Sequence, residues 1–259
     1  MCAFRLLKNL TSVAFGFVAL SGACTLAAAA EIKVLTAGAF KPVVLALVPD
    51  FEKKTGHKVS VENDTVGGLA KRIAGGEAFD LAVLSPATIE PLVKAGKFAD
   101  GGAQRLAKVG IGVAVKRGAP LPDISSVASF REALVNARAV AYIDPAAGGS
   151  SGIYFSLLLD KMGVADKVKP KAVLVPGGLV AQKLVTGEAD LAVHQVSEIL
   201  AVPGAVLVGQ IPAEVQNFTV YAGGVSASAR DAAAARALLA AFLAPDAQAM
   251  MKQKGMDAP

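Results

Sequence analysis

Residues 139–154 read AVAYIDPAAGGSSGIY. The first five residues predict a buried strand, the Asp-Pro pair and the two glycines predict a turn, and a helix is expected to begin near Gly152. A helix N-terminus presents unpaired N–H groups and a partial positive charge, and Ser150 and Ser151 add two hydroxyls there. The stretch therefore predicts either a site that holds a small anion without lysine or arginine, or an ordinary serine N-cap.

Strands and helices also alternate on both sides of this stretch. Strands are expected over residues 32–36, 58–62, 81–84, 171–175 and 191–193, with helical patterns between them. This alternation predicts parallel sheets covered by helices, with the loops at the carboxyl ends of the strands forming a ligand crevice. Ala39, Thr65 and Ser85 fall on that edge.

Residues 106–115 form a long apolar strand with no helical pattern directly behind it, and residues 218–225 form another apolar strand. We expect these strands to carry the chain from one lobe into a second lobe and back. Residues 31–112 together with 222–259 then form lobe 1, and residues 113–221 form lobe 2. The predicted fold class is α/β, and each lobe has a mainly parallel sheet flanked by helices.

Residues 1–30 have the composition of a secretory signal peptide. Two basic residues precede an apolar run over residues 10–23, and a run of alanines ends at Ala30, near which we expect cleavage. A retained membrane anchor is the alternative, because the apolar run is nearly long enough to span a bilayer. Both cysteines lie in this leader, so we expect no disulfide, and whether Cys24 is lipidated stays open.

The charge and the residue types argue against several kinds of partner. The formal net charge is +5, and removal of Arg5 and Lys8 with the leader lowers it to +3. Lysine and arginine are scattered, which argues against nucleic acid. His57 and His194 lie 137 residues apart, and no cysteine follows the leader, so we expect neither a metal nor a cofactor. We expect a monomer.

Five segments share their order and spacing with one known family. They are VLTAGAFK at 34–41, FEKKTG at 51–56, GLAKRI at 68–73, FDLAVLS at 79–85, and the loop over 144–154. Together they resemble the periplasmic molybdate-binding proteins of ABC importers, over essentially the whole mature chain. The resemblance implies a type II periplasmic binding protein fold, with two lobes, two crossover strands, and an oxyanion held between the lobes by hydroxyls and backbone N–H groups.

The resemblance also implies ligand contacts. The first serine of the family falls on Ala39, which has no hydroxyl, and the second falls on Val66, with Thr65 beside it. The loop contact of the second lobe falls near Ser151. Ser85 is a further candidate in the first lobe.

The remaining candidates lie in the second lobe. Ser150 adjoins the loop contact, and the next backbone contact of the family falls on Gly177 or Gly178. The binding tyrosine of the family falls on Gln195, and His194 stands beside it at an expected strand end. The layout of the family's site is thus present, with different chemistry at several positions.

The two missing hydroxyls leave the identity of the ligand open. A hydrogen bond to a charged acceptor contributes about 1.5 to 3 kcal/mol, so two uncompensated losses cost roughly 3 to 6 kcal/mol, or about a hundredfold to ten-thousandfold in affinity. Molybdate, a different small anion and a small polar organic solute all stay open. The resemblance implies a periplasmic solute-binding protein that is not an enzyme and that delivers its ligand to an ABC permease in the inner membrane.

An exported serine hydrolase is the alternative from another class. The sequence GGSSG at 148–152 matches the G-x-S-x-G motif, and Ser150 is followed by Asp190 and His194 in hydrolase order. That motif needs its serine on a sharp turn directly after a strand, whereas a proline and four further residues intervene here. We therefore prefer the binding protein.

Overall fold

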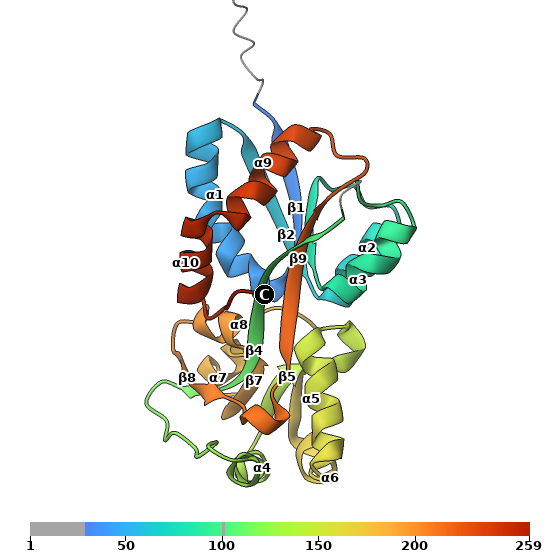
Figure 1. Ribbon diagram of the computed structural model, residues 1–259. Helices are drawn as coiled ribbons and strands as arrows, with labels where there is room; N and C mark the ends of the chain where they lie inside the picture. The colour runs from blue at the N-terminus through green and yellow to red at the C-terminus, as the bar shows by residue number, and fades with distance from the viewer. Residues whose placement is uncertain (1–28, 100–101) are drawn as a thin grey trace, which may run out of the picture.

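The computed structural model describes residues 29–99 and 102–259, and it consists of two lobes stacked one above the other (Figure 1). The chain passes between the lobes on β4 (Gln104–Lys116) and β9 (Phe218–Val225), which pair antiparallel with each other. The predicted pair of crossover strands is therefore confirmed. The expected signal peptide and Cys24 fall outside the described residues, apart from Ala29 and Ala30.

Lobe 1 is built on parallel strands in the order β2-β1-β3. Strand β9 pairs antiparallel with β3, and β4 pairs antiparallel with β9. Its parallel strands are β1 (Glu31–Ala37), β2 (Lys58–Asp64) and β3 (Leu81–Leu84). Every residue of the central strand β3 is buried, whereas the edge strand β2 alternates exposed and half-buried residues along most of its length. The helices of this lobe are α1 (Lys41–Thr55), α2 (Val66–Ala74), α3 (Pro86–Lys94), α9 (Ala232–Leu243) and α10 (Pro245–Gln253).

Lobe 2 continues the sheet on the other side of β4. Strand β7 pairs antiparallel with β4 and parallel with β5, and β6 lies parallel to β5 at the edge. These strands are β5 (Val140–Ile143), β6 (Ala172–Val175) and β7 (Leu191–Gln195), and β8 (Ala205–Gln210) pairs antiparallel with β4. The helices are α4 (Val127–Asn136), α5 (Ser150–Lys161), α6 (Ala165–Val168), α7 (Gln182–Val185) and α8 (Val196–Leu200).

The hydrophobic core is divided between the lobes. In lobe 1 the buried rings of Phe40 and Phe242 meet edge to face, with their centroids 5.7 Å apart. Along β4, Val109 belongs to the core of lobe 1 and Ile111 to the core of lobe 2. The core thus changes along β4 close to residue 112, after which the sequence predicts the lobe boundary. The exact bounds of the two lobes stay a prediction.

The loop that the sequence singles out differs from expectation at one point. Helix α5 begins at Ser150 instead of near Gly152, and its N-cap is Gly149, so the interpretation as an ordinary serine N-cap is wrong. The helix packs very close to the end of β5, since a Cβ atom on Gly152 would lie 2.2 Å from the carbonyl oxygen of Ile143. Because glycine occupies this position, the first turn of α5 can lie directly against the strand.

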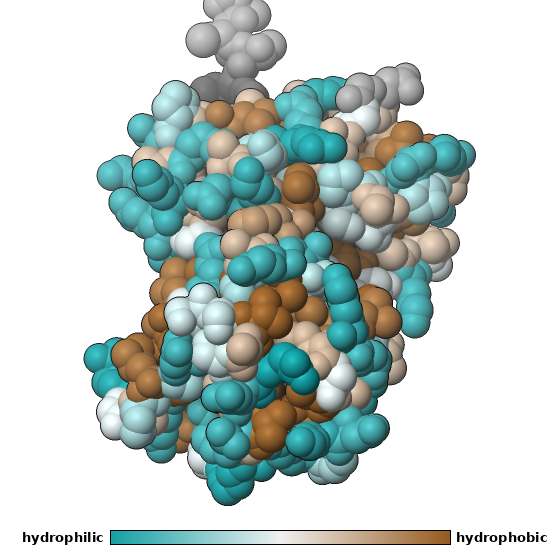
Figure 2. All heavy atoms as spheres, turned by 60° about the horizontal axis from the view of Figure 1, so that its bottom comes forward, coloured by the Kyte–Doolittle hydropathy of each residue, from teal (hydrophilic) through white to brown (hydrophobic). Residues whose placement is uncertain are grey.

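The surface carries hydrophobic residues in patches separated by hydrophilic ones, as Figure 2 shows on the side nearest lobe 2. Among the described residues of lobe 2, Leu121 and Leu157 are the most exposed large hydrophobic residues, each 64% exposed. Across residues 29–99 and 102–259, no helix is both long enough and apolar enough to cross a membrane.

Replacing Gly152 tests whether this close packing supports the fold. We expect Gly152→Ala to lower the free energy of unfolding by about 1 to 3 kcal/mol, because the added methyl group overpacks against backbone that cannot move aside. Gly177→Ala is the matched control, since a Cβ atom there meets nothing within 4 Å. Urea unfolding followed by circular dichroism measures both variants, and equal stabilities would contradict the packing argument.

Candidate functional site

A small chamber of about 30 Å³ lies between the two lobes, where β1, β2, β7 and β9 meet the first turns of α2 and α5. A larger hollow, of about 440 Å³, is lined by residues of lobe 2 alone and does not lie between the lobes. The chamber is lined by Ala37, Gly38, Ala39, Asn63, Asp64, Thr65, Val66, Ile143, Gly149, Ser150, Ser151, Gly178, His194, Gln195, Glu198 and Tyr221.

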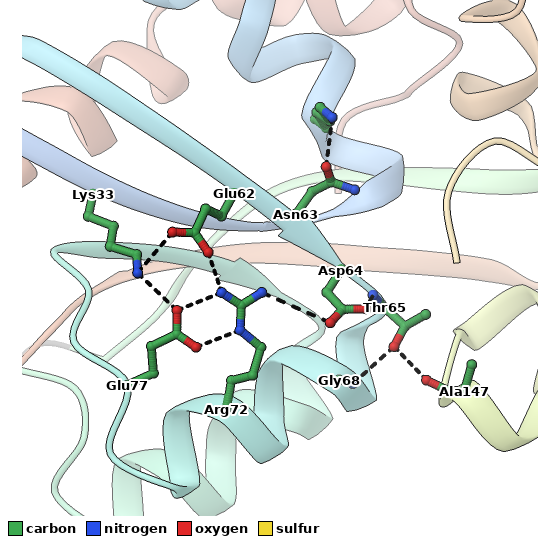
Figure 3. Close-up of polar contacts among 10 residues, drawn as sticks. Lys33, Glu62, Asn63, Asp64, Thr65, Gly68, Arg72, Glu77 and Ala147 are labelled. Atoms are coloured by element: carbon green, nitrogen blue, oxygen red, sulfur yellow. Dashed lines mark hydrogen bonds and ion pairs between the residues drawn. The ribbon is translucent and has the colours of Figure 1, made fainter. Parts of the chain in front are cut away.

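Hydrogen bonds join the lobes at the edge of this chamber. The Thr65 hydroxyl accepts from Gly68 N at 2.9 Å, which caps α2, and it donates to the carbonyl oxygen of Ala147 in lobe 2 at 2.5 Å (Figure 3). Gly67 N donates to the carbonyl oxygen of Gly148 at 3.1 Å. The lobes are thus in contact, and the cleft is closed around the chamber.

The two glycines allow this contact because they have no side chains. A Cβ atom on Gly67 would lie 3.0 Å from the Cα atom of Gly148, and a Cβ atom on Gly148 would lie 2.9 Å from the Cα atom of Gly67. Any larger residue at either position would hold the two backbones apart. The closed arrangement therefore depends on glycine in both lobes.

Lobe 2 contributes donors from the start of α5. The first N–H groups of this helix, those of Ser150, Ser151 and Gly152, have no partner within the helix, as in any α-helix. The Ser150 hydroxyl accepts from Gln195 Nε2 at 3.2 Å and from the Thr219 hydroxyl at 3.2 Å. These bonds fix the serine and the glutamine beside the helix terminus, which favours an anion.

Two buried polar atoms at the chamber have no hydrogen-bond partner. They are Nδ1 of His194 and Oε1 of Gln195, and they are the buried side-chain atoms without a partner in the described part of the chain. Both side chains are about 1% exposed, and both line the chamber. Buried polar groups are nearly always paired, so these atoms indicate a place for a bound molecule or water.

Glu198 is a buried carboxyl group at the same place. Its residue is 6% exposed, and its Oε2 atom lies 3.2 Å from Nε2 of His194. Burial raises the pKa of Glu198 to about 8 and lowers the pKa of His194 well below the usual histidine value. A Cβ atom on Gly38 would lie 2.5 Å from Glu198 Oε1, so glycine in lobe 1 makes room for this side chain.

Two basic side chains near the chamber pair with polar side chains of lobe 1. Arg72 pairs with Glu62 and Glu77, and its Nη1 atom lies 4.0 Å from Oδ2 of Asp64 (Figure 3). Lys41 Nζ donates to Oδ1 of Asn63 at 2.6 Å. Since neither lysine nor arginine is among the described residues that line the chamber, its donors are helix N–H groups and serine hydroxyls.

The chamber contains most of the residues that the sequence suggests. Ala39, Thr65, Val66, Ser150, Ser151, Gly178, His194 and Gln195 line it. Ser85 does not, because its hydroxyl pairs with Thr88 at 2.7 Å at the start of α3, and Gly177 is exposed outside the chamber. Contact of any of these residues with a ligand stays a prediction.

Sequence reasoning missed Tyr221, Glu198, Asn63 and Asp64, which also line the chamber. Tyr221 comes from the crossover strand β9, and burial together with the nearby Glu198 raises the pKa of its hydroxyl. The family's tyrosine position falls on Gln195, but a tyrosine hydroxyl still reaches the site from this other strand. The only signal in the sequence is a tyrosine in an otherwise apolar strand.

The serine hydrolase arrangement is not assembled. Asp190 accepts from the backbone N–H groups of Arg138 and Ala139 at 2.9 and 2.8 Å, before the start of β7, whereas His194 lies near the other end of that strand. Ser150 is bonded to Gln195 and Thr219 instead of to a histidine. The alternative based on Ser150, Asp190 and His194 is therefore wrong. In the described residues, no group of three or more potential metal ligands occurs either.

Comparisons with known proteins agree with this geometry. Residues 32–257 match the family model described as bacterial extracellular solute-binding protein. A protein of Pseudomonas sp. named aconitate isomerase is 32% identical over 256 residues, covering 96% of each chain.

Solved structures share the fold. The periplasmic molybdate-binding protein of Azotobacter vinelandii is 22% identical, with a TM-score of 0.76 over 88% of this chain and 100% of the other. The sulfate-binding protein SubI of Mycobacterium tuberculosis is 18% identical, with a TM-score of 0.69 over 88% and 87% of the two chains. The predicted fold, the type II periplasmic binding protein fold, is therefore confirmed.

The buried carboxyl group should lower stability in a way that depends on pH. Glu198 has a raised pKa in the folded chain, so between about pH 4 and 8 the unfolded chain has released a proton that the folded chain retains, and stability decreases as pH rises. We expect Glu198→Gln to be more stable than the wild type at pH 8, by at least about 1.4 kcal/mol, which corresponds to one pKa unit.

The difference should shrink toward pH 4, where the carboxyl group is protonated in both states. Urea unfolding at pH 4, 6 and 8 measures it, and the exposed Glu90→Gln serves as the control. An effect of Glu198→Gln that does not change with pH would contradict this assignment of charge.

Proposed function

The chain belongs to the bacterial extracellular solute-binding protein family, and from that premise we propose that it binds one small anionic solute between its lobes and presents it to an ABC permease. The proposed location is the periplasm, where a signal peptide over residues 1–30 would direct it. Docking to the permease would depend on the closed shape, in which loops of both lobes meet.

The observation that carries this proposal is that residues of both lobes line one closed chamber. Ala39, and Val66 at the start of α2, come from lobe 1, and the first turn of α5 comes from lobe 2. Neither lobe alone could satisfy all the acceptor atoms of an anion. Ligand binding would therefore favour the closed arrangement over an open one by the difference in affinity between the two.

We propose a small carboxylic acid as the ligand in place of a tetrahedral oxyanion. At neutral pH a carboxylate, like molybdate and sulfate, offers only acceptors, so the hydrogen-bonding groups of the chamber suit both classes and the choice rests on the similarity to one relative. The relative named aconitate isomerase supports the same ligand class, because aconitate is an unsaturated tricarboxylate. The molybdate- and sulfate-binding neighbours support the oxyanion alternative.

A second hollow gives a longer acid room beyond the chamber. This vestibule, of about 810 Å³, shares Gly38, Asn63, Gly178 and Glu198 with the chamber. Lys41 and Lys254 also line it. One carboxylate of the acid would lie at the helix termini in the chamber, and the others would extend toward these two cations.

The expectation that the protein is not an enzyme remains a prediction. Binding and delivery require no chemistry on the solute. The relative named aconitate isomerase is the observation that argues for a second function in the same cleft.

A thermal-shift panel tests the ligand class. We expect trans-aconitate to raise the melting temperature more than molybdate, tungstate, sulfate or phosphate, because binding to the folded state alone adds about 2.7 kcal/mol at a hundred times the dissociation constant. A shift with molybdate or sulfate alone would contradict the choice of a carboxylic acid. No shift with any of these anions would contradict the proposed binding site.

A variant of the glycine contact tests closure. We expect Gly67→Val to weaken binding of the shifting ligand at least about tenfold, or about 1.4 kcal/mol, because its side chain meets the backbone of Gly148 and holds the lobes apart. Titration calorimetry measures affinity, and small-angle scattering measures the closure. Gly209→Ala is the control, because a Cβ atom there makes only an ordinary contact of 3.6 Å with Ile124. Wild-type affinity in Gly67→Val would contradict the requirement for closure.

A further inference from the structure

We infer that Glu198, positioned by His194, is the general base of a proton-transfer site that removes a proton from a carbon atom activated by a carboxylate of the bound acid. The inference rests on the proposed function, because the acid must first occupy the chamber. It adds a chemical activity to a cleft that otherwise only binds.

The position of Glu198 is the first argument. Its side chain is shared by the chamber and the vestibule, so it lies where the carbon skeleton of an acid spanning both would pass. One carboxylate oxygen lies 3.2 Å from Nε2 of His194, and the other faces Gly38, where no side chain intervenes. His194 thus holds one oxygen in place, while the other lies close to Gly38 in a side chain that lines both hollows.

Comparison with another buried carboxylate supports a role beyond folding. Asp80, which is 2% exposed, accepts from the backbone N–H groups of Lys33 and Arg230 at 2.7 and 2.8 Å and lies 3.4 Å from the Arg230 guanidinium. It is therefore part of the framework. Within the described residues, no backbone N–H group donates to Glu198, and its near polar neighbour is His194.

The surroundings suit a base stronger than an ordinary carboxylate. Burial raises the pKa of Glu198 to about 8, so it is close to the operating pH range in which general bases are most effective. The titratable and charged groups around the chamber and vestibule are His194 on β7, Tyr221 on β9, Asp64 at the end of β2, Lys41 on α1 and Lys254 after α10.

The proton transfer requires no reactant other than the bound acid and Glu198. The Glu198 carboxylate takes a proton from a C–H bond, and the electron pair of that bond moves into the adjacent conjugated carboxylate. The N–H groups of Ser150 and Ser151 at the start of α5 would stabilise the negative charge that develops on its oxygens. If the hydrogen on the Glu198 carboxyl group exchanges with solvent first, its return to the same carbon gives isotope exchange in D₂O, and return of a hydrogen to another carbon of the delocalised system gives an isomer.

The test uses the purified full-length protein with trans-aconitate in D₂O, followed by proton NMR. We expect loss of the methylene signal through exchange, and the appearance of the cis isomer, faster than in buffer alone. The rate constant at saturating trans-aconitate should rise as pH rises toward and through 8. Glu198→Gln should lower this rate at least about a hundredfold, as expected for loss of a general base, and still bind trans-aconitate in the thermal-shift assay.

Three further variants test the roles of Glu198 and His194. Glu198→Asp should retain part of the rate, and the exposed Glu90→Gln should retain all of it. His194→Gln should alter the pH at which the rate rises, because the imidazole positions the base. A change in the maximum rate alone, with the pH profile unaltered, would contradict this role for His194.

Two results overturn the inference and are distinguishable from each other. Binding of trans-aconitate without exchange, or exchange that survives Glu198→Gln, would overturn the proton-transfer site and leave the proposed binding function intact. Absence of trans-aconitate binding to the wild type would overturn both.

Discussion

The contact between Gly67 and Gly148 is the constraint on which the rest of the site depends. These residues belong to different lobes, and their backbones approach so closely that no Cβ atom fits between them without a shift. This approach brings the first turns of α2 and α5 to one small chamber. The chamber between them is small, about 30 Å³, and its buried polar atoms need partners from the protein, from water or from a ligand.

Much of the fold follows from local patterns, because each strand and helix is encoded by its own residues. The crossover strands are recognisable because both are apolar and the first has no helical pattern directly behind it, and β4 and β9 match the predicted ranges closely. The loop before α5 also predicts which part of the chain forms the site. The helix begins two residues earlier than predicted, at Ser150, and the close packing of Gly152 on Ile143 is a tertiary contact that no local pattern reveals.

The chemistry of the chamber was less accessible to sequence reasoning. Tyr221 reaches the site from a strand that returns to lobe 1, and Glu198 comes from a short helix that follows Gln195. A glutamate in a helix is usually solvated, so nothing local indicates that this one is buried. Ser85 is the reverse case. It stands at a strand end on the predicted edge, so it was expected to line the site, but its hydroxyl pairs with Thr88.

The cleft combines features of a binding site with one feature that binding does not require. Helix termini and serine hydroxyls suffice to hold an anion, whereas a buried carboxyl group beside a neutral histidine lowers stability and repels anions once ionised. Retention of such a pair is understandable if it acts on the bound molecule. Binding and proton transfer would then use the same closed state.

The most direct measurement is a crystal structure of the protein grown with trans-aconitate. The account predicts one carboxylate in the chamber, within about 2.7 to 3.2 Å of the N–H groups of Ser150 and Ser151, with the carbon chain beside Glu198 and closed lobes. A chamber that holds only water while trans-aconitate occupies another surface, or a saturated crystal with no ligand between the lobes, would contradict it.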